Sequence, residues 1–390
     1  MKLSFFLINM NLGGTEKSFL NLLESFPQDT EVDLLLLEKK GNLLERVPNN
    51  VKVITIENNI TINELIKLGS RRFGFRQLTK GNVGLFLRSE IQFLLEKLKL
   101  IQNPYWAIQA YLKPLEENYD ISIAYAGIHN FIAHYILHKT QARKKVLWIH
   151  FDIDNVISNF SFGKKYYPYF NQIFCVAENA TNIFKKRFPA TNDNVFTFNN
   201  IINAKSLLKE AKIAESYNDE FQGVRILTLG RLSKEKGQLF IPNIVKRLKG
   251  KNIIFRWYLI GEGKLTPLLN KEIKTLSIDN ELILLGSKIN PYGYLKDCDI
   301  YVQTSFHEGD PVVLREAKVF NKPVITTNFL SASNLITHNE DGLITEISEE
   351  GIYQGVKMLL ENETLRKKFS TSHISETDVE KNIDHLLTIN

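Results

Sequence analysis

The chain has 390 residues, of which 44% are hydrophobic and 24% are charged, and this length and composition predict two globular domains. Its two cysteines and the lack of an apolar run of about 18–20 residues exclude a disulfide-stapled scaffold and a bilayer-spanning segment in this sequence. The net charge of +6 lies in residues 60–113, which hold nine basic and three acidic residues. The rest of the chain has forty of each sign, and this balance argues against a nucleic-acid-binding surface there.

Apolar runs alternate with helical patterns from end to end. Strands are expected at 2–9, 32–38, 51–56, 121–126, 145–151, 173–177, 224–230, 255–261, 282–286, 300–305 and 323–327. Helices are expected at 16–26, 179–188, 238–250 and 350–362. Continuous apolar strands between helices are typical of parallel sheets covered on both faces, so we predict two doubly wound, Rossmann-like α/β units.

The domain boundary is expected in the polar stretch 200–222, ahead of a new strand and glycine turn. We predict a first domain at 1–203, with a basic helical insertion at about 58–118, and a second at 204–374. The remaining residues, 375–390, carry a helical pattern that we expect to pack back on the first domain.

Two features of the first domain could belong to a site. Gly13 and Gly14 follow the first strand and open a helix, where they would let a ligand approach the backbone, although the full dinucleotide-binding pattern is missing. His150 ends the strand at 145–151; a lone histidine is more often structural, but ligands bind at the carboxyl ends of such strands.

The basic segment 60–113 also carries aromatic side chains and, over 85–100, a helix-like apolar repeat. This combination suits an anionic membrane surface, which predicts binding to anionic vesicles at low salt and release at high salt. A helical insertion with a merely solvated basic face is the alternative.

The loop after the strand at 224–230 places two cations at a strand end. Gly230 is followed by Arg231 and, five residues further, by Lys236. Both could grip an anion at the carboxyl edge of the sheet, or both could be solvated loop charges.

Residues 305–317 carry two glutamates eight residues apart, Glu308 and Glu316. Asp310 before Pro311 predicts a helix N-cap with proline at the first helical position, and the helix is expected to end near Phe320. Glu308 would then precede a helix N-terminus, which binds anions, and Glu316 would follow it, so that a diphosphate could rest between two carboxylates. Alternatively, both acids are idle surface charges.

The chain resembles a GT-B glycosyltransferase of glycosyltransferase family 4, of the bacterial capsule and surface-polysaccharide type. The resemblance rests on Glu308 to Glu316 (Glu-x7-Glu), on Gly230 to Gly237, on Gly13 to Leu23, and on the shorter stretches 175–178 and 200–203. This sequence departs from the family at Asp310, where an apolar or aromatic residue is usual, and at Ile201, where Gly or Pro is common.

The resemblance implies a retaining hexosyltransferase that needs no metal or cofactor, takes a nucleotide-sugar, above all a UDP-sugar, and transfers to a saccharide or lipid-linked acceptor. Arg231 and Lys236 would neutralise the diphosphate, Glu308 would contact the donor sugar, and Glu316 would hold the ribose. His150 would complete the site from the acceptor domain. The remaining donor-binding positions would be Gly13, Gly14, Gly230, Lys288, Gly309, Asp310, Pro311, Val312 and Val313.

The resemblance also implies a cytoplasmic enzyme or one peripheral at the inner face of the cytoplasmic membrane. Three alternatives stay open: a nucleotide-sugar epimerase on the same architecture, a non-catalytic sugar-binding protein, and a metal-dependent GT-A enzyme. The last would use an Asp-x-Asp pair, for which Asp152 with Asp154 and Asp297 with Asp299 have the spacing.

Overall fold

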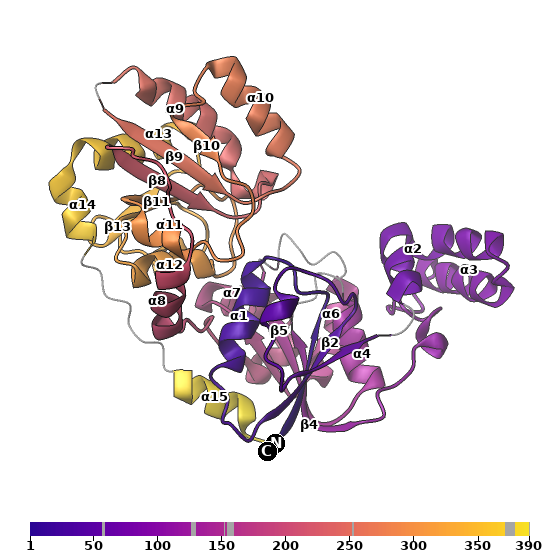
Figure 1. The fold of residues 1–390 in the computed structure, drawn as a ribbon. Coiled ribbons are helices and arrows are strands. Elements are labelled where there is room, and N and C mark those ends of the chain that lie inside the picture. Colours follow the sequence, from indigo (N-terminus) through magenta and orange to yellow (C-terminus); the bar gives the residue numbers. More distant parts are fainter. Residues whose placement is uncertain are drawn as a thin grey trace. The chain divides into compact units, whose positions relative to one another are not determined.

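The computed structural model describes residues 1–56, 59–125, 130–151, 153, 160–251, 253–370 and 379–389. The chain forms two compact units (Figure 1). The first comprises Met1–Asn11, Leu23–Asn199 and Asp378–Asn390, and the second comprises Leu12–Leu22 and Asn200–Thr377. The sequence assigned Leu12–Leu22 to the first domain, whereas the structure groups it with the second unit.

The first unit is built on a seven-stranded, all-parallel sheet in the order β3-β2-β1-β4-β5-β6-β7. Its strands are β1 (Lys2–Leu7), β2 (Glu31–Leu36), β3 (Lys52–Thr55), β4 (Asn118–Tyr125), β5 (Gln141–Ile149), β6 (Gln172–Cys175) and β7 (Val195–Thr197). In the central register, Phe5 of β1 lies opposite Leu34 of β2 and Ile123 of β4. These apolar side chains are fully buried, as expected for strands covered on both faces.

Helices of the first unit bury one sheet face in a core that includes Phe6, Leu147 and Ile173. That core also takes side chains from α4 (Phe131–Lys139), α6 (Phe160–Tyr166) and α7 (Glu178–Arg187). Two further helices, α2 (Asn59–Thr79) and α3 (Val83–Lys97), form a hairpin that projects beyond the sheet in Figure 1. We call α2, α3 and the following residues up to 113 the arm.

The C-terminal helix α15 (Val379–Leu387) also belongs to the first unit. Lys144 of β5 donates from Nζ to the carbonyl oxygens of Leu386 and Thr388, both at 2.7 Å. A cation at a helix C-terminus satisfies carbonyl groups that have no partner in the helix. Burial lowers the pKa of Lys144 to about 8.

The second unit has a six-stranded parallel sheet in the order β10-β9-β8-β11-β12-β13. Its strands are β8 (Val224–Leu229), β9 (Phe255–Ile260), β10 (Leu282–Leu284), β11 (Ile300–Gln303), β12 (Val324–Thr327) and β13 (Gly342–Thr345). One face packs on α9 (Ile241–Lys249), α10 (Thr266–Leu276) and α13 (Glu349–Glu361), with α14 (Glu363–Phe369) following. The other packs on α8 (Ala204–Ile213), α11 (Tyr292–Asp297) and α12 (Val312–Val319).

The predicted fold class is confirmed, and each of the eleven expected strands overlaps an observed one. The sequence missed β7 and β13, which are three and four residues long and sit at sheet edges, where a short run carries little periodicity. In the described part of the chain, no helix has both the length and the apolar character to cross a bilayer.

Candidate active site

Glu308 lies in the loop between β11 and α12, and three donors converge on one oxygen of its carboxylate. Lys236 Nζ, Gln303 Nε2 and Ser305 Oγ each lie 2.6 Å from Glu308 Oε1. The side chain is 11% exposed. No described residue binds Oε2, so the described contacts fix the carboxylate through one oxygen.

Two of the three donors to Glu308, Gln303 and Ser305, come from one face of β11 and its extension. Tyr301, Gln303 and Ser305 alternate along the chain and therefore point to the same side. Tyr301 donates to Gln303 Oε1 at 2.7 Å, and Gln303 Nε2 also donates to Ser305 Oγ at 2.9 Å. Sequence reasoning missed these supports, although polar residues at every second position of an otherwise apolar strand were a visible signal.

The loop from Gly230 to Gly237 is bound to the strand end that carries Glu308. Gly237 has φ 67°, and a Cβ there would collide with the carbonyl oxygen of Thr304. Thr304 Oγ1 in turn donates to the carbonyl of Lys236 at 2.7 Å. These contacts hold Lys236 beside Glu308, as expected for two loops at neighbouring strand ends.

Arg231 remains available in the same loop. Its side chain is 70% exposed, and its nearest acid is Glu235, at 4.0 Å. A Cβ at Gly230 would meet nothing within 4 Å, so the backbone before Arg231 faces open space. The loop therefore offers an exposed cation in Arg231, a cation bound to Glu308 in Lys236, and an approachable backbone.

The predicted N-cap at Asp310 is wrong. Helix α12 begins at Val312 with Pro311 at the cap position, and no side chain caps it. Asp310 is buried because its carboxylate accepts from the backbone N–H of Asn200 at 3.1 Å and pairs with Arg315 Nε at 3.1 Å. Burial raises the pKa of Asp310, and Arg315 and Asn200 act in the opposite direction.

Because no side chain caps α12, no capping side chain accepts hydrogen bonds from the backbone N–H groups of its first turn. Leu314 N–H donates to the carbonyl of Pro311 at 3.0 Å, whereas the N–H groups of Val312 and Val313 have no acceptor among the described residues. Unpaired amides at a helix start form an anion-binding position. Gly309 separates this turn from Glu308 by a short loop.

Glu316 lies on α12 and is fully buried. Its Oε1 accepts from Tyr292 Oη at 2.8 Å and lies 3.6 Å from Lys17 Nζ, which also sits over the Tyr292 ring at 4.9 Å from its centre. Oε2 is buried without a hydrogen-bond partner among the described residues. Sequence reasoning identified Glu316 but missed Lys17 and Tyr292, which no local pattern connects to it.

The glycine turn before α1 (Gly14–Leu23) lies at the start of α12. A Cβ on Gly14 would be 3.9 Å from Val312 Cγ2, and a Cβ on Gly13 would meet the Glu16 carboxylate, which would have to turn aside. Burial raises the pKa of Glu16, and the positive charge of Arg231 opposes that shift. The structure thus brings Gly13, Gly14, Arg231 and the start of α12 into one neighbourhood.

For two predicted site residues, His150 and Lys288, no described contact joins them to Glu308 or Glu316. His150 belongs to the first unit, directly after β5, with its ring centre 4.3 Å from that of Tyr125 and its Nε2 buried without a described partner; burial lowers its pKa to about 3. Lys288 follows β10 and pairs with Glu215 at 2.8 Å, and no described contact joins it to Glu308 or Glu316.

Of the acid pairs considered for a metal site, the structure describes Asp297 and Asp299, which bind other groups. Asp297 Oδ2 accepts from Ser216 Oγ at 2.6 Å, and Asp299 Oδ2 accepts from the backbone N–H of Arg225 at 2.7 Å. Asp152 and Asp154 lie outside the described residues.

Comparison with known proteins gives a consistent assignment. Residues 210–375 match the family model "Glycosyl transferases group 1". The N-acetylgalactosamine-N,N'-diacetylbacillosaminyl-diphospho-undecaprenol 4-alpha-N-acetylgalactosaminyltransferase of Campylobacter jejuni is 32% identical over 172 residues, which cover 44% of this chain and only 45% of that enzyme. A second C. jejuni enzyme, an alpha-1,4-N-acetyl-D-galactosaminyltransferase named for a diphospho-undecaprenol-linked substrate, is 24% identical over 96% of each chain.

Solved structures match the whole fold. HepE of Anabaena, crystallised with UDP and glucose, aligns with a TM-score of 0.70 at 14% identity over 99% of each chain. TarM of Staphylococcus aureus aligns with a TM-score of 0.67 at 14% identity, covering 100% of this chain and 97% of TarM. Residues 210–375 therefore match a group 1 glycosyltransferase domain, and the chain as a whole has the two-unit GT-B fold of these solved structures.

Proposed function

We propose that this protein is a retaining, metal-independent glycosyltransferase of family 4, which transfers a hexose from a UDP-sugar to a lipid-linked saccharide in surface-polysaccharide synthesis. One observation carries the proposal. Glu308 and Glu316 flank the uncapped start of α12. In each carboxylate, one oxygen lies close to a lysine ammonium group and the other oxygen has no described partner. A ligand with hydroxyl groups at both ends of a diphosphate fits this arrangement.

In the proposed complex, the diphosphate lies against the amides of Val312 and Val313. Lys236 and Arg231 offset the charge that develops on the β-phosphate as the bond from the sugar to it breaks. Because Lys236 also binds Glu308, the same lysine would orient the carboxylate near the donor sugar. Glu316 would accept a ribose hydroxyl on Oε2, the atom that is buried and unpaired without a ligand.

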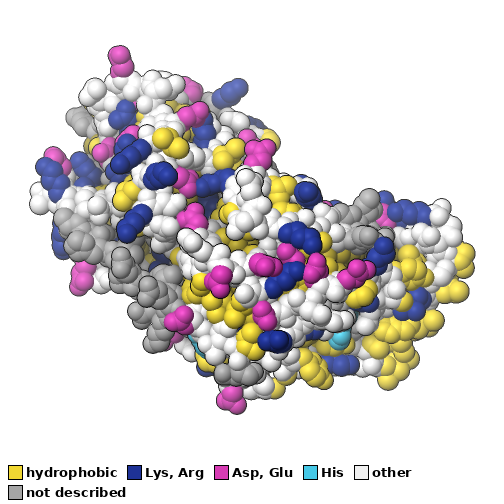
Figure 2. Space-filling model, turned by 60° about the horizontal axis from the view of Figure 1, so that its bottom comes forward, with side chains coloured by type: hydrophobic (Ala, Val, Ile, Leu, Met, Phe, Trp, Pro, Cys, Tyr) yellow, Lys and Arg dark blue, Asp and Glu magenta, His cyan; other side chains and the backbone are white. Residues whose placement is uncertain are grey.

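Two of the relatives are named for diphospho-undecaprenol-linked substrates, which supports a lipid-linked acceptor here. Helix α3 carries an exposed apolar stripe at four- and three-residue spacing, and its side chains are between 46% and 65% exposed: Val83, Leu87, Ile91, Leu94 and Leu98. Figure 2 shows hydrophobic side chains gathered on the arm with basic ones among them. We propose that this face docks on the anionic inner surface of the cytoplasmic membrane.

A nucleotide-sugar screen tests the proposal. We expect one UDP-sugar to raise the melting temperature by mass action and to be consumed, with release of UDP, when a lipid-linked saccharide is added. Activity in EDTA and retention of anomeric configuration, read by NMR of the product, are the expected outcomes. Loss of activity in EDTA that Mg²⁺ restores, or conversion of the sugar without an acceptor, would contradict it.

A further inference from the structure

Contacts between α2, α3 and the segment that follows them hold the arm together. Gly74 of α2 lets the helices approach so closely that a Cβ there would lie 2.8 Å from Ser89 Cβ of α3. Arg88 of α3 donates to the carbonyl oxygens of Ala107 at 2.8 Å and Trp106 at 3.1 Å. The segment after α3 is therefore tied back onto the hairpin.

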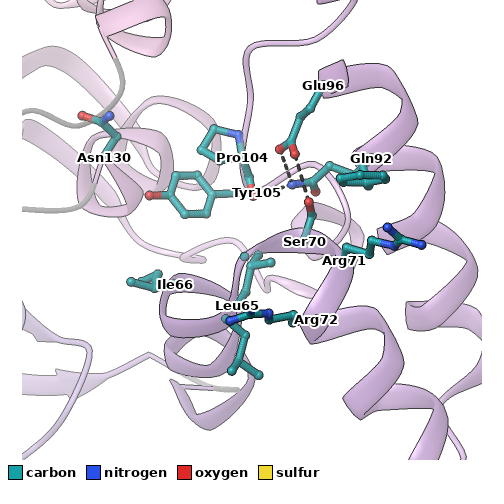
Figure 3. A pocket seen from close by; sticks show the side chains of 13 residues that line it. Leu65, Ile66, Ser70, Arg71, Arg72, Gln92, Glu96, Pro104, Tyr105 and Asn130 are labelled. Atoms are coloured by element: carbon teal, nitrogen blue, oxygen red, sulfur yellow. Dashed lines mark hydrogen bonds between the residues drawn. The ribbon is translucent and has the colours of Figure 1, made fainter. Parts of the chain in front are cut away.

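Between these elements lies a cavity of about 540 Å³, within the size range of small-molecule sites (Figure 3). Helix α2 is kinked beside it at Gly69, where φ is 72° and a Cβ would meet nothing within 4 Å. Its apolar lining comes from both helices and the following segment: Leu65, Ile66, Leu68, Phe93, Pro104 and Tyr105. Such a wall accommodates hydrocarbon.

Two consecutive cations line the same cavity. Arg71 lies over the Phe93 ring at 5.1 Å from its centre, and Figure 3 shows Arg71 and Arg72 on the opposite side of the cavity from Asn130. Neither guanidinium pairs with a carboxylate of a described residue. Figure 3 shows the two side chains pointing in different directions, so each guanidinium group is a separate position that can bind a phosphate oxygen.

The acid of the lining, Glu96, is already occupied. Its Oε2 accepts from Ser70 at 2.9 Å and its Oε1 from Gln92 Nε2 at 2.7 Å. Gln92 also donates to the carbonyl of Pro104 at 2.8 Å. Glu96 thus holds the cavity wall together, and the lining keeps a net positive charge from its two arginines.

We propose that this cavity binds the diphosphate and the first isoprenoid-like units of a lipid diphosphate. The arginines would hold the phosphates, the apolar lining would take the start of the hydrocarbon chain, and the apolar stripe of α3 belongs to the same hairpin. The inference rests on the proposed function, because it assigns a site to the lipid carrier of the acceptor. No described residue of the group around Glu308 lines this cavity.

Isothermal titration with farnesyl diphosphate tests the assignment on the intact chain. We expect binding to the native protein, and at least roughly tenfold weaker binding of both farnesol and inorganic diphosphate, which each supply one half of the ligand. R71A/R72A should lose at least roughly tenfold in affinity for farnesyl diphosphate, because it removes two charge-assisted contacts. Ile66→Trp should also lose affinity by filling the apolar side of the cavity.

K97A/K99A is the matched control, because it removes the same charge from exposed positions of the arm outside the cavity. Equal losses in K97A/K99A and R71A/R72A, equal affinity for farnesol, or no binding of farnesyl diphosphate would each overturn the site. UDP should raise the melting temperature of the native protein and of R71A/R72A equally. Absence of any UDP effect would count against the proposed function and leave the lipid result standing.

Discussion

The buried pair of Lys17 and Glu316 allows a quantitative test of how the second unit is held together. Replacing Lys17 by Met removes the ammonium group that lies 3.6 Å from Glu316 Oε1, and leaves Tyr292 as the described donor to this carboxylate. Breaking a buried ion pair from one side costs about 3–5 kcal/mol, because the remaining charge loses its partner. Lys17 is 16% exposed and the separation is long, so we expect the lower end, about 3 kcal/mol.

A double-mutant cycle separates the pair from its surroundings. In Glu316→Gln the buried charge itself is gone, so adding Lys17→Met should cost only about 1 kcal/mol more, which gives a coupling of about 2 kcal/mol. Urea unfolding of the four proteins at an unchanged m-value measures it. The exposed pair Lys357–Glu361 is the control, with an expected coupling below about 0.5 kcal/mol. Additive effects of Lys17→Met and Glu316→Gln would refute the reasoning.

Three further predictions address catalysis, membrane binding and pH. In a UDP-sugar turnover assay, Lys236→Ala should lower kcat by about 10²–10³-fold. Glu308→Gln should also lower kcat without unfolding the protein. A wild-type kcat in either variant would contradict the site. Leu87→Gln with Leu94→Gln should weaken binding to anionic vesicles in sedimentation, whereas equal binding of native protein to neutral vesicles would contradict docking. Burial lowers the pKa of His134 to about 3. Below about pH 6.5 the unfolded chain therefore takes up a proton at this residue and the folded chain does not. Between pH 7 and pH 5 the free energy of unfolding of the native protein should fall by about 2 kcal/mol more than that of His134→Leu. Parallel pH profiles of the two proteins in urea unfolding would rule this out.

The sequence predicted those parts of the site that depend on strand ends. Loops that follow parallel strands lie at the carboxyl edge of their sheet, so the pattern placed Arg231, Lys236 and Glu308 each in a loop at a strand end. In the structure, β8 and β11 are neighbours, and Lys236 does contact Glu308. The alternation of strands and helices makes these strand ends predictable, whereas the roles of Arg231, Lys236 and Glu308 stay predictions.

The missed features depend on choices between competing partners far apart in the chain. Asp310 before Pro311 has the local pattern of an N-cap, but a buried amide at Asn200 and the guanidinium of Arg315 offer its carboxylate stronger partners. Ser18 Oγ donates to Asn200 Oδ1 at 2.6 Å, so α1 takes part in the same arrangement. No periodicity connects residues 18, 200 and 310, and the sequence could not reveal this chain of bonds.

The two glutamates resemble each other in a way that bears on what they bind. In each carboxylate one oxygen is engaged, with Lys236 or Lys17 close by, and the other oxygen has no described partner. Leaving a buried acceptor unpaired costs about 1–3 kcal/mol, so a fold that only needed structural acids would gain by pairing Glu316 Oε2. An unpaired oxygen near each end of a free helix start instead suits a ligand that brings its own hydroxyl donors. In the proposed complex, a ligand hydroxyl would supply the donor that Glu316 Oε2 lacks among the described residues.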